Sequence, residues 1–453
     1  MSPPAATRFL ARRIAALRFG HLPRRVVDHA KACLLDWIGS AVCGSTSPTA
    51  AIALSCVRRM AGKGPATLVG ASPGASPFGA AFYNGAVAAV DEIDDVHEDA
   101  SLHPGIVVIP AALALAEDRG ASGQDLLTAV VAGYDVVVRI ARAAGASHYA
   151  YWHTTGTCGT FGAAAAAGSI LGLDASAMTL ALGLAGTQAA GLWESLNDAA
   201  TMAKHLHSAK AASSGVLAAL LAREGFQGSP TILEGKKGFL ASSSQATPED
   251  LKRLTAGFGQ LFLITRNFFK RYACCRANFE GVEVIERLRE ADGAALGAIR
   301  RITVTMKPNR LWLISVRSPT TTSDAKFSLP FCMALMALTG RVSPREFARK
   351  NLGDLAIRRF MRKIALVADP ACPVKSRIEI HFRGGRAPLT SEPVCRSPEL
   401  TDVGRKFVET LTPLLPRPRI QRLLSAVDRM DQVESLTELS RLLATLPTRR
   451  LPR

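Results

Sequence analysis

The sequence lacks the short motifs that mark several common kinds of active site. Its 453 residues contain no P-loop, G-x-G-x-x-G fingerprint or G-x-S-x-G elbow in a usable context, which argues against nucleotide-dependent and serine-hydrolase chemistry. No C-x-x-C and no H-E-x-x-H occurs either, so neither an iron–sulfur cluster nor a zinc centre of the usual spacing is indicated. We therefore expect no metal and no cofactor.

Acidic and aromatic residues are both scarce. Asp and Glu number 37 against 55 Lys and Arg, which gives a formal net charge of +18, and aromatic residues make up 6% of the chain. The basic residues are scattered, and neither a binding-module signature nor interleaved aromatics accompany them. We therefore expect no nucleic-acid partner. A basic surface would equally attract a small substrate with several negative charges.

The nine cysteines form no recognisable disulfide framework. Their number is odd and no secretory signal precedes them, which predicts a protein of the reducing cytoplasm. The uncharged stretches 158–173 and 175–193 are Gly-rich and separated by Asp174, so they predict buried helices and no membrane association. With 48% hydrophobic residues at this length, we expect a globular protein of two or three domains.

The densest group of titratable residues lies just before a Pro-Gly pair. It comprises Asp91, Glu92, Asp94, Asp95, His97, Glu98 and Asp99, and His103-Pro104-Gly105 follows. We expect an acidic helix, a sharp turn carrying His103, and a buried helix that starts at Pro110. Such a corner holds the groups that proton transfer needs. The spacing of Asp91, Asp95 and Asp99 also fits a solvated helix face, and a metal site is a third interpretation.

Three further blocks place basic or imidazole side chains beside predicted helix starts. Residues 148–162, HYAYWHTTGTCGTFG, carry His153 ahead of threonines that can cap a helix, whose exposed amides bind anions. Residues 204–207, KHLH, open an amphipathic helix, and residues 268–276 read FFKRYACCR. Lys and Arg bind carboxylates. Each block alone is equally typical of ordinary structure, but six of the nine histidines lie within residues 97–207, which favours a real site.

Together these blocks resemble the MmgE/PrpD family over nearly the whole chain. The similar patterns are E-I-D-D-V-H…L-H-P-G-x-x-V-x-P-A-A-L-A-L-A-E, W-H-x-T-x-T-x-G, K-x-L-H-x-A-x-A-A and K-x-Y-x-C-C-R-A. The resemblance implies a mainly α fold and a homodimer. We expect a large all-α domain at residues 1–259, a smaller α/β domain at 260–395, and C-terminal helices at 396–453 that pack back on the first domain. Alternating patterns at 300–308 and 377–386 predict strands in the smaller domain.

The resemblance also implies a site for acid/base chemistry in a cleft between the two domains. His103 would be the leading acid or base, beside three further catalytic residues: Lys204, His153 and Glu92. The residues implied to bind substrate are Asp95, His97, Lys270, Arg276, Cys275 and His207. Charge would develop on a carbon next to a carboxylate, which requires cations on that carboxylate and a positioned acid and base.

The implied activity is that of a cofactor-independent lyase of a small polycarboxylate. Dehydration of a 2-methylcitrate-like substrate is favoured over decarboxylation of a cis-aconitate-like one. An epimerase of a related dicarboxylate such as iminodisuccinate, or a non-catalytic carboxylate-binding protein, is the alternative. Three departures from the family's patterns bear on this choice: Val96 replaces a threonine, Phe279 a histidine and Phe331 a tyrosine. Each removes a polar group, which leaves the reaction open.

Overall fold

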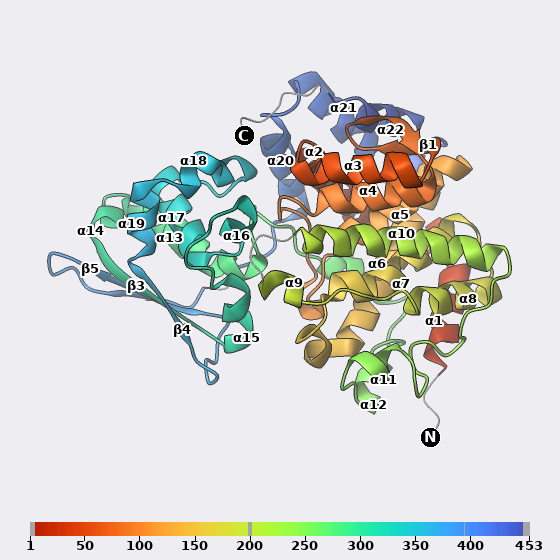
Figure 1. Ribbon diagram of the computed structural model, residues 1–453, viewed down its shortest axis with the longest axis horizontal. Coiled ribbons are helices and arrows are strands. Elements are labelled where there is room, and N and C mark those ends of the chain that lie inside the picture. The colour runs from red at the N-terminus through yellow and green to blue at the C-terminus, as the bar shows by residue number, and fades with distance from the viewer. Residues whose placement is uncertain (1–4, 198–201, 394, 447–453) are drawn as a thin grey trace.

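The computed structural model describes residues 5–197, 202–393 and 395–446 of the chain. A large helical part and a smaller part with a sheet lie side by side (Figure 1). The longer helices of the large part are α1 (Ala6–Ala16), α2 (Arg24–Gly44), α3 (Pro48–Met60), α4 (Pro77–Ala88), α5 (Gly105–Arg119), α6 (Gly123–Tyr149), α7 (Thr154–Ile170), α8 (Ala175–Gly186) and α10 (Ala203–Arg223). The chain is mainly α with a smaller α/β part, which confirms the fold class predicted from the sequence.

Helix α7 lies at the centre of the helical part, because its small residues let other helices approach closely. It packs against α5, α6 and α10, and every residue from Thr154 to Gly168 is buried. At Gly162 an added Cβ would lie 2.7 Å from the Cβ of Val137 in α6, and at Gly159 it would lie 3.1 Å from a methyl group of Val107 in α5. The neighbouring helices are therefore held at short distances from one axis.

A hairpin lies between α3 and α4. Strands β1 (Lys63–Leu68) and β2 (Ala71–Ala75) pair antiparallel around Gly70, whose φ of +75° suits glycine. The side chain of Asn84 in α4 accepts from the Val69 N–H at 3.0 Å and donates to the Thr67 carbonyl at 2.8 Å. The hairpin is thus held by a side chain of the helix that follows it.

The smaller part is built on a four-stranded sheet of order β4-β3-β5-β6, in which only the β3–β4 pair is parallel. Its strands and longer helices are α13 (Phe279–Asp292), β3 (Ile299–Met306), α16 (Thr322–Lys326), α17 (Leu329–Thr339), α19 (Leu355–Met361), β4 (Ile364–Ala368), β5 (Arg377–Phe382) and β6 (Leu389–Ser391). The strands predicted at 300–308 and 377–386 are confirmed as β3 and β5. Along β3, buried Ile302 and Val304 alternate with more accessible side chains such as exposed Arg301, so one face of the sheet packs inward.

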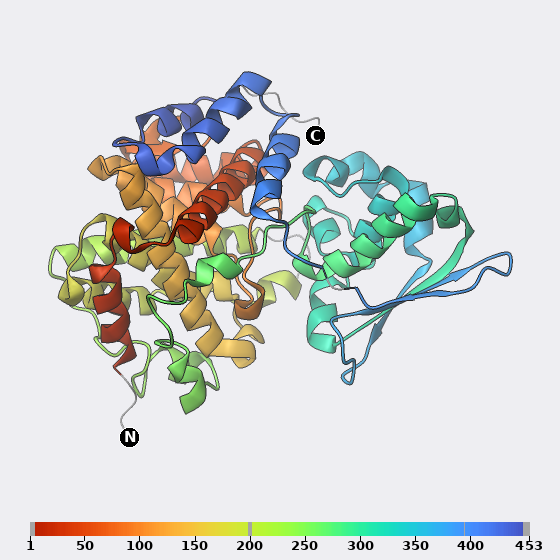
Figure 2. The ribbon, with the colours of Figure 1, turned by 180° about the vertical axis from the view of Figure 1, so that it is seen from behind.

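The C-terminal segment returns to the helical part. It forms α20 (Leu400–Leu411), α21 (Arg417–Asp428) and α22 (Thr437–Ala444). Helix α20 packs against α2, and the Leu443 carbonyl accepts from the Gly70 N–H at 2.8 Å. Figures 1 and 2 show these helices beside α2 from opposite sides. Residues 447–453, the end of the segment expected to pack back, lie outside the described residues.

The acidic segment is not the helix that its composition suggested. Helix α4 ends at Ala88, the chain runs irregularly to a short 3₁₀ turn at Glu98–Ala100, and α5 begins at Gly105 with Pro110 inside it. The start of α5 is set by Asp95, whose Oδ1 accepts from the Gly105 N–H at 3.0 Å. Asp95 is also buried, so the interpretation of this residue as part of a solvated helix face was wrong.

No single helix among the described residues is long and apolar enough to span a membrane. Helices α2 and α3 meet the criteria of length and composition only as a pair, which is bent by 92° at its break. The uncharged stretches at 158–173 and 175–193 contain α7 and α8, and the two helices bury most of their side chains within the protein. Both stretches were expected to form buried helices, and they do.

Candidate active site

The loop between α4 and α5 carries the acidic residues and His103, and it is held by lysines from elsewhere. Lys326 of α16 donates to the Val90 carbonyl at 2.9 Å and pairs with Asp91 at 2.8 Å. Glu92 has a φ of +54°, a conformation that costs energy for a residue with a side chain and that surrounding contacts must hold in place. Strain of this kind often accompanies a functional site.

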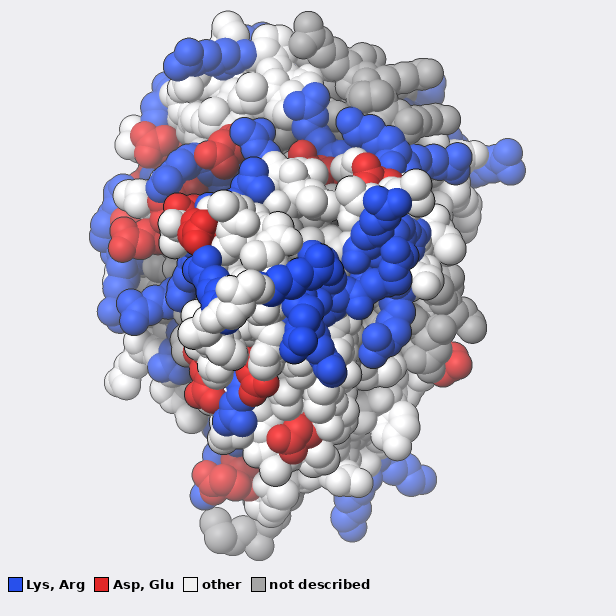
Figure 3. All heavy atoms as spheres, turned by 90° about the vertical axis from the view of Figure 1, so that its left-hand side faces the viewer, with Lys and Arg blue, Asp and Glu red and all other residues white. Residues whose placement is uncertain are grey.

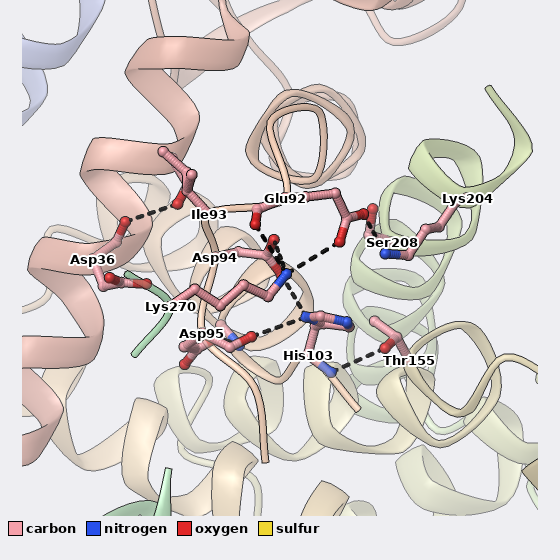
Figure 4. Close-up of polar contacts among 12 residues, drawn as sticks. Asp36, Glu92, Ile93, Asp94, Asp95, His103, Thr155, Lys204, Ser208 and Lys270 are labelled. Carbon is pink, nitrogen blue, oxygen red and sulfur yellow. Dashed lines mark hydrogen bonds and ion pairs between the residues drawn. The ribbon is translucent and has the colours of Figure 1, made fainter. Parts of the chain in front are cut away.

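Glu92 and Asp94 lie at the centre of a buried ion network (Figure 4). Glu92 pairs with Lys204 of α10 through one oxygen and with Lys270 through the other, the latter at 3.1 Å. The Lys270 ammonium also lies 3.5 Å from Asp94. All four side chains are less than a tenth exposed. The structure thus brings together Glu92, Lys204 and Lys270, which the sequence predicted in three separate blocks.

His103 joins this network through Asp94. Its Nδ1 lies 2.8 Å from Asp94 Oδ2 and 3.0 Å from the Asp95 carbonyl oxygen. Both oxygens only accept hydrogen bonds, so Nδ1 carries a proton and Nε2 is the nitrogen left to exchange protons with a substrate. The backbone N–H of His103 donates to Thr155 Oγ1 at 3.0 Å.

The threonines of α7 do not cap the helix, although the sequence predicted that they would. His153 occupies the N-cap position, and no side chain caps the helix there. Thr155 instead binds the His103 backbone, and Thr157 Oγ1 lies 2.8 Å from Nε2 of His148. The hydroxyls of Thr155 and Thr157 thus bond to groups outside the helix and not to the first amides of α7.

The charges of the network are set by burial and by neighbouring ions. Burial alone would raise the pKa of Glu92, but Lys204 and Lys270 outweigh it and hold that pKa well below its usual range. Lys270 and His103 likewise overcome burial and lower the pKa of Asp94 to about 2. Both carboxyl groups are therefore ionised near neutral pH and cannot donate a proton there.

His103 is the imidazole of the network, and its pKa lies below the ordinary value. Burial lowers the pKa of His103, the Asp94 carboxylate opposes this, and Lys270 and Lys204 add to the lowering. An anionic substrate would raise that pKa by bringing further negative charge. With His103 protonated, three cations face the carboxylates of Glu92 and Asp94, an excess that favours a bound anion.

His153 and His207 form a second, neutral pair beside the network. Their Nδ1 atoms lie 3.0 Å apart, and the ring centre of His153 lies 6.4 Å from that of His103 and 4.5 Å from that of Trp193. Burial and then Lys204 hold the pKa of His153 well below its usual range, and burial lowers that of His207 to about 4. This pair can orient or hydrogen-bond a substrate without carrying charge.

Asp95 lies next to the network but is enclosed by protein groups. Its Oδ2 accepts from Tyr134 Oη and from Asn267 Nδ2, each at 2.5 Å, and its Oδ1 accepts from the Gly105 N–H. Burial, aided by Asp36, raises the pKa of Asp95 to about 7. These contacts tie the loop to α5, α6 and the segment before Lys270, which is a positioning role.

Three other predicted residues differ in their surroundings. His97 is 1% exposed, and neither ring nitrogen has a hydrogen-bond partner among the described residues. Arg276 is occupied by Glu98 at 2.5 Å and Glu280 at 3.0 Å. Cys275 is half-buried, and burial followed by the Glu92 charge raises its thiol pKa. Cys275 thus borders the network, whereas Arg276 is committed to carboxylates of the protein.

Sequence reasoning did not assign several residues that hold the site. Asp94 was seen in the acidic run, but nothing in the sequence distinguished it from Asp95. Lys326 stands in the block KFSLPF and could have been found there. Lys406 of α20 donates to the Ile93 carbonyl at 2.5 Å and pairs with Asp36 of α2. No short motif around Lys406 indicates a role.

The three departures from the family's patterns lie in apolar packing. Val96 is buried, and its backbone forms a bridge with Phe268. Phe279 packs against Phe268 and the ring of Tyr272. Phe331 is fully buried against Phe347. None of the contacts described above between His103, Asp94, Glu92 and the lysines involves these side chains, so the polar network is complete without them.

Lys and Arg gather on the outer face of the smaller part (Figure 3). Arg300 and Arg301 of β3, Arg359 of α19 and Arg362 are exposed in this part of the chain. The face is turned away from the helical part that carries His103. Among the residues that the structure describes, no three His, Cys, Asp or Glu side chains are grouped as a metal ion would require.

The fold and the network define a class of protein: a mainly helical chain with a smaller α/β part and a buried acid–base group where the two parts contribute residues. The chain belongs to the MmgE/PrpD family, whose N-terminal domain matches residues 8–251 and whose C-terminal domain matches residues 272–431.

Its similarity to individual proteins extends along nearly the whole chain. It is 28% identical to a cis-aconitate decarboxylase-like protein of Aspergillus oryzae, with 95% of each chain covered. It is 26% identical to the cis-aconitate decarboxylase of Aspergillus terreus, with 92% of each covered. It is 27% identical to the human cis-aconitate decarboxylase, with 96% of this chain and 94% of the human one covered.

Proposed function

We propose that this protein is a lyase of a small polycarboxylate and that it decarboxylates a cis-aconitate-like substrate by acid–base catalysis without a cofactor. The observation that carries the proposal is the buried His103–Asp94 pair beside Lys204 and Lys270. The sequence favoured dehydration. The names of the relatives shift the preference to decarboxylation.

In the proposed reaction the bond to the departing carboxylate breaks and CO₂ leaves. The released electron pair forms a new carbon–carbon double bond as the existing one shifts, and the far alkene carbon takes up one proton. Protonated His103 supplies that proton from Nε2, while the Asp94 carboxylate and the Asp95 carbonyl lie against Nδ1. Lys204 and Lys270 stabilise the carboxylate next to the carbon where charge develops.

The carboxyl groups and Lys270 around His103 are unsuited to donate the proton, which supports His103 as the acid. Glu92 and Asp94 are ionised, and the pKa of Lys270 is raised by Asp94 and Glu92 against the effect of burial. Asp95 has a pKa near neutrality but is enclosed by Tyr134 and Asn267. His103, in contrast, keeps 14% of its side chain exposed.

Proton NMR in D₂O with purified protein tests the proposal. The panel is cis-aconitate, 2-methylcitrate, citrate and iminodisuccinate, each followed together with CO₂ release. We expect cis-aconitate to give CO₂ and a new alkene signal, with deuterium at one carbon. Water loss from 2-methylcitrate would replace decarboxylation by dehydration, and deuterium exchange alone in iminodisuccinate would indicate an epimerase. Unchanged spectra throughout would reject the lyase.

A further inference from the structure

Lys406 and Asp36 lie outside the four sequence blocks that carry the candidate site residues, yet Lys406 contacts the loop of the candidate site. Lys406 belongs to α20, which follows the α/β part in the sequence, and Asp36 belongs to α2. The Lys406 ammonium pairs with Asp36 and donates to the Ile93 carbonyl at 2.5 Å. Figure 4 shows Asp36 and Ile93 beside the group formed by Glu92, Asp94 and His103.

Ile93 is the residue between the two carboxylates of the network. Its carbonyl belongs to the peptide unit that leads into Asp94, and Glu92 immediately before it holds a φ of +54°. Because peptide units are planar, a rotation of the Ile93–Asp94 unit turns Asp94 relative to Glu92. Such a rotation would change the 2.8 Å contact of Asp94 with His103 and the 3.5 Å contact with Lys270.

We propose that the Lys406–Asp36 pair is a positioning device for catalysis, which holds the Ile93 peptide so that Asp94 and Glu92 keep their places on His103 and the lysines. The role rests on the lyase proposed above. Asp36, with a side chain only 1% exposed, fixes the direction of the Lys406 ammonium. The C-terminal helices thus reach the site through one side chain.

An ion pair that only joined α2 and α20 would not require a hydrogen bond from Lys406 to the loop. Helix α20 already packs on α2 through buried Val403, Phe407 and Leu411, and an ion pair between Lys406 and Asp36 would complete that contact. The additional hydrogen bond from Lys406 to the Ile93 carbonyl contributes to the packing of neither helix. It stabilises a strained backbone in the loop, which is a requirement of the site.

The test is a double variant, Asp36→Asn with Lys406→Met, which removes the contact while leaving the net charge unchanged. The matched control is Arg405→Met, the next residue on α20, whose side chain is 70% exposed and pairs at the surface with Asp402. We expect kcat of the double variant with the decarboxylated substrate to fall about 10–100-fold, with KM changed far less, because small displacements of reacting groups cost that much. The control should match the wild type.

A second readout separates positioning from folding. As Asp94 moves off His103, the pKa of His103 should fall, and ¹⁵N-histidine NMR would record this in the double variant but not in Arg405→Met. Amide exchange of residues 89–103 should quicken while the rest of the protein stays protected. If both stayed as in the wild type, or if kcat fell only in proportion to the folded fraction, the positioning role would be rejected.

Both readouts are made without turnover, so they stand apart from the lyase proposal. A wild-type protein that turns over no substrate would reject the proposed function. The histidine titration and amide exchange would still decide whether Lys406 holds the loop. Should the double variant fail to fold, Lys406→Met alone, which keeps an unbranched stem as far as Cε and loses the ammonium, gives the same two readouts and the same two outcomes.

Discussion

At the scale of single residues, the properties of His103 follow from its neighbours. Burial and two lysines favour the neutral imidazole, while Asp94 favours the charged one. The sequence predicted His103 as the acid or base from a motif alone. It could not show that Asp94 holds the ring while Asp95, one position later, is enclosed by Tyr134, because the direction of a side chain in an irregular loop depends on distant contacts.

Replacing His103 with Asn should lower kcat about 10²–10⁴-fold, the usual contribution of a positioned proton donor. Binding of substrate should weaken less, since Lys204 and Lys270 remain. Steady-state kinetics on cis-aconitate would measure both. The control is His381→Gln on β5, a histidine with no part in the network. Equal kinetics for the two variants would remove His103 from the mechanism.

Asp94→Asn should shift the pH dependence in a defined direction. If protonated His103 is the acid, activity falls as pH rises through the His103 pKa. The Asp94 carboxylate raises that pKa, so its loss moves the fall in activity to lower pH. A profile of kcat/KM between pH 5 and about 8 would show it. A shift to higher pH would contradict the assignment.

The ionisation of Asp95 should affect the stability of the protein and not the reaction. Its pKa in the folded protein is about 7, against an ordinary value of 3.8, so between these values the folded state binds a proton that the unfolded state does not. The free energy of unfolding contributed by Asp95 therefore falls as pH rises from about 4 to about 7. The Tm of wild type minus that of Asp95→Asn should decrease over this range and then level off. A constant difference would place the Asp95 pKa near its ordinary value.

At the scale of elements, regular patterns were predicted well and the site loop was not. Strands β3 and β5 alternate buried and more accessible residues, which local sequence expresses directly, and the buried helix α7 stands out as an uncharged run. The acidic stretch was taken for a helix because its residues tolerate one, whereas its actual path is fixed by Lys326, Lys270 and Lys406, which come from elsewhere in the chain.

The two non-glycine residues of positive φ in the described chain test this view of the loop. Ser101, at φ +47°, is exposed, and Glu92, at +54°, is buried in the network. Ser101→Gly should stabilise the protein by about 0.5 kcal/mol, because glycine adopts this conformation without strain. Glu92→Gly should destabilise it despite the same relief, since two buried lysines lose their partner. Urea unfolding of both variants measures the contrast, and equal effects would show that backbone strain alone governs the loop.

At the scale of the whole molecule, the site is assembled from segments far apart in sequence. The loop, α7 and α10 come from the N-terminal half, Lys270 precedes the α/β part, and Lys406 follows it. Family patterns identified most of these segments, because each carries its own motif. The contribution of α20 has no motif, so only the folded chain reveals it.

The proposed reaction takes its proton from His103 and its positive charge from Lys204 and Lys270, and on that mechanism we expect activity to survive removal of metals. Prolonged dialysis against EDTA should leave kcat with cis-aconitate unchanged within experimental error. Protein dialysed with buffer alone is the control. Activity lost with EDTA and restored by one divalent ion would contradict cofactor independence.

The glycines of α7 have a consequence for how this protein can change over evolution. Gly156, Gly159 and Gly162 stand where a methyl group would meet His207 or the Ala190 backbone, Val107 of α5, and Val137 of α6 respectively. An alanine at any of these positions would force the neighbouring segment away from α7. New substrate preferences should therefore arise through residues that border the network, such as Cys275 and Trp193, while the central helix stays invariant among working variants.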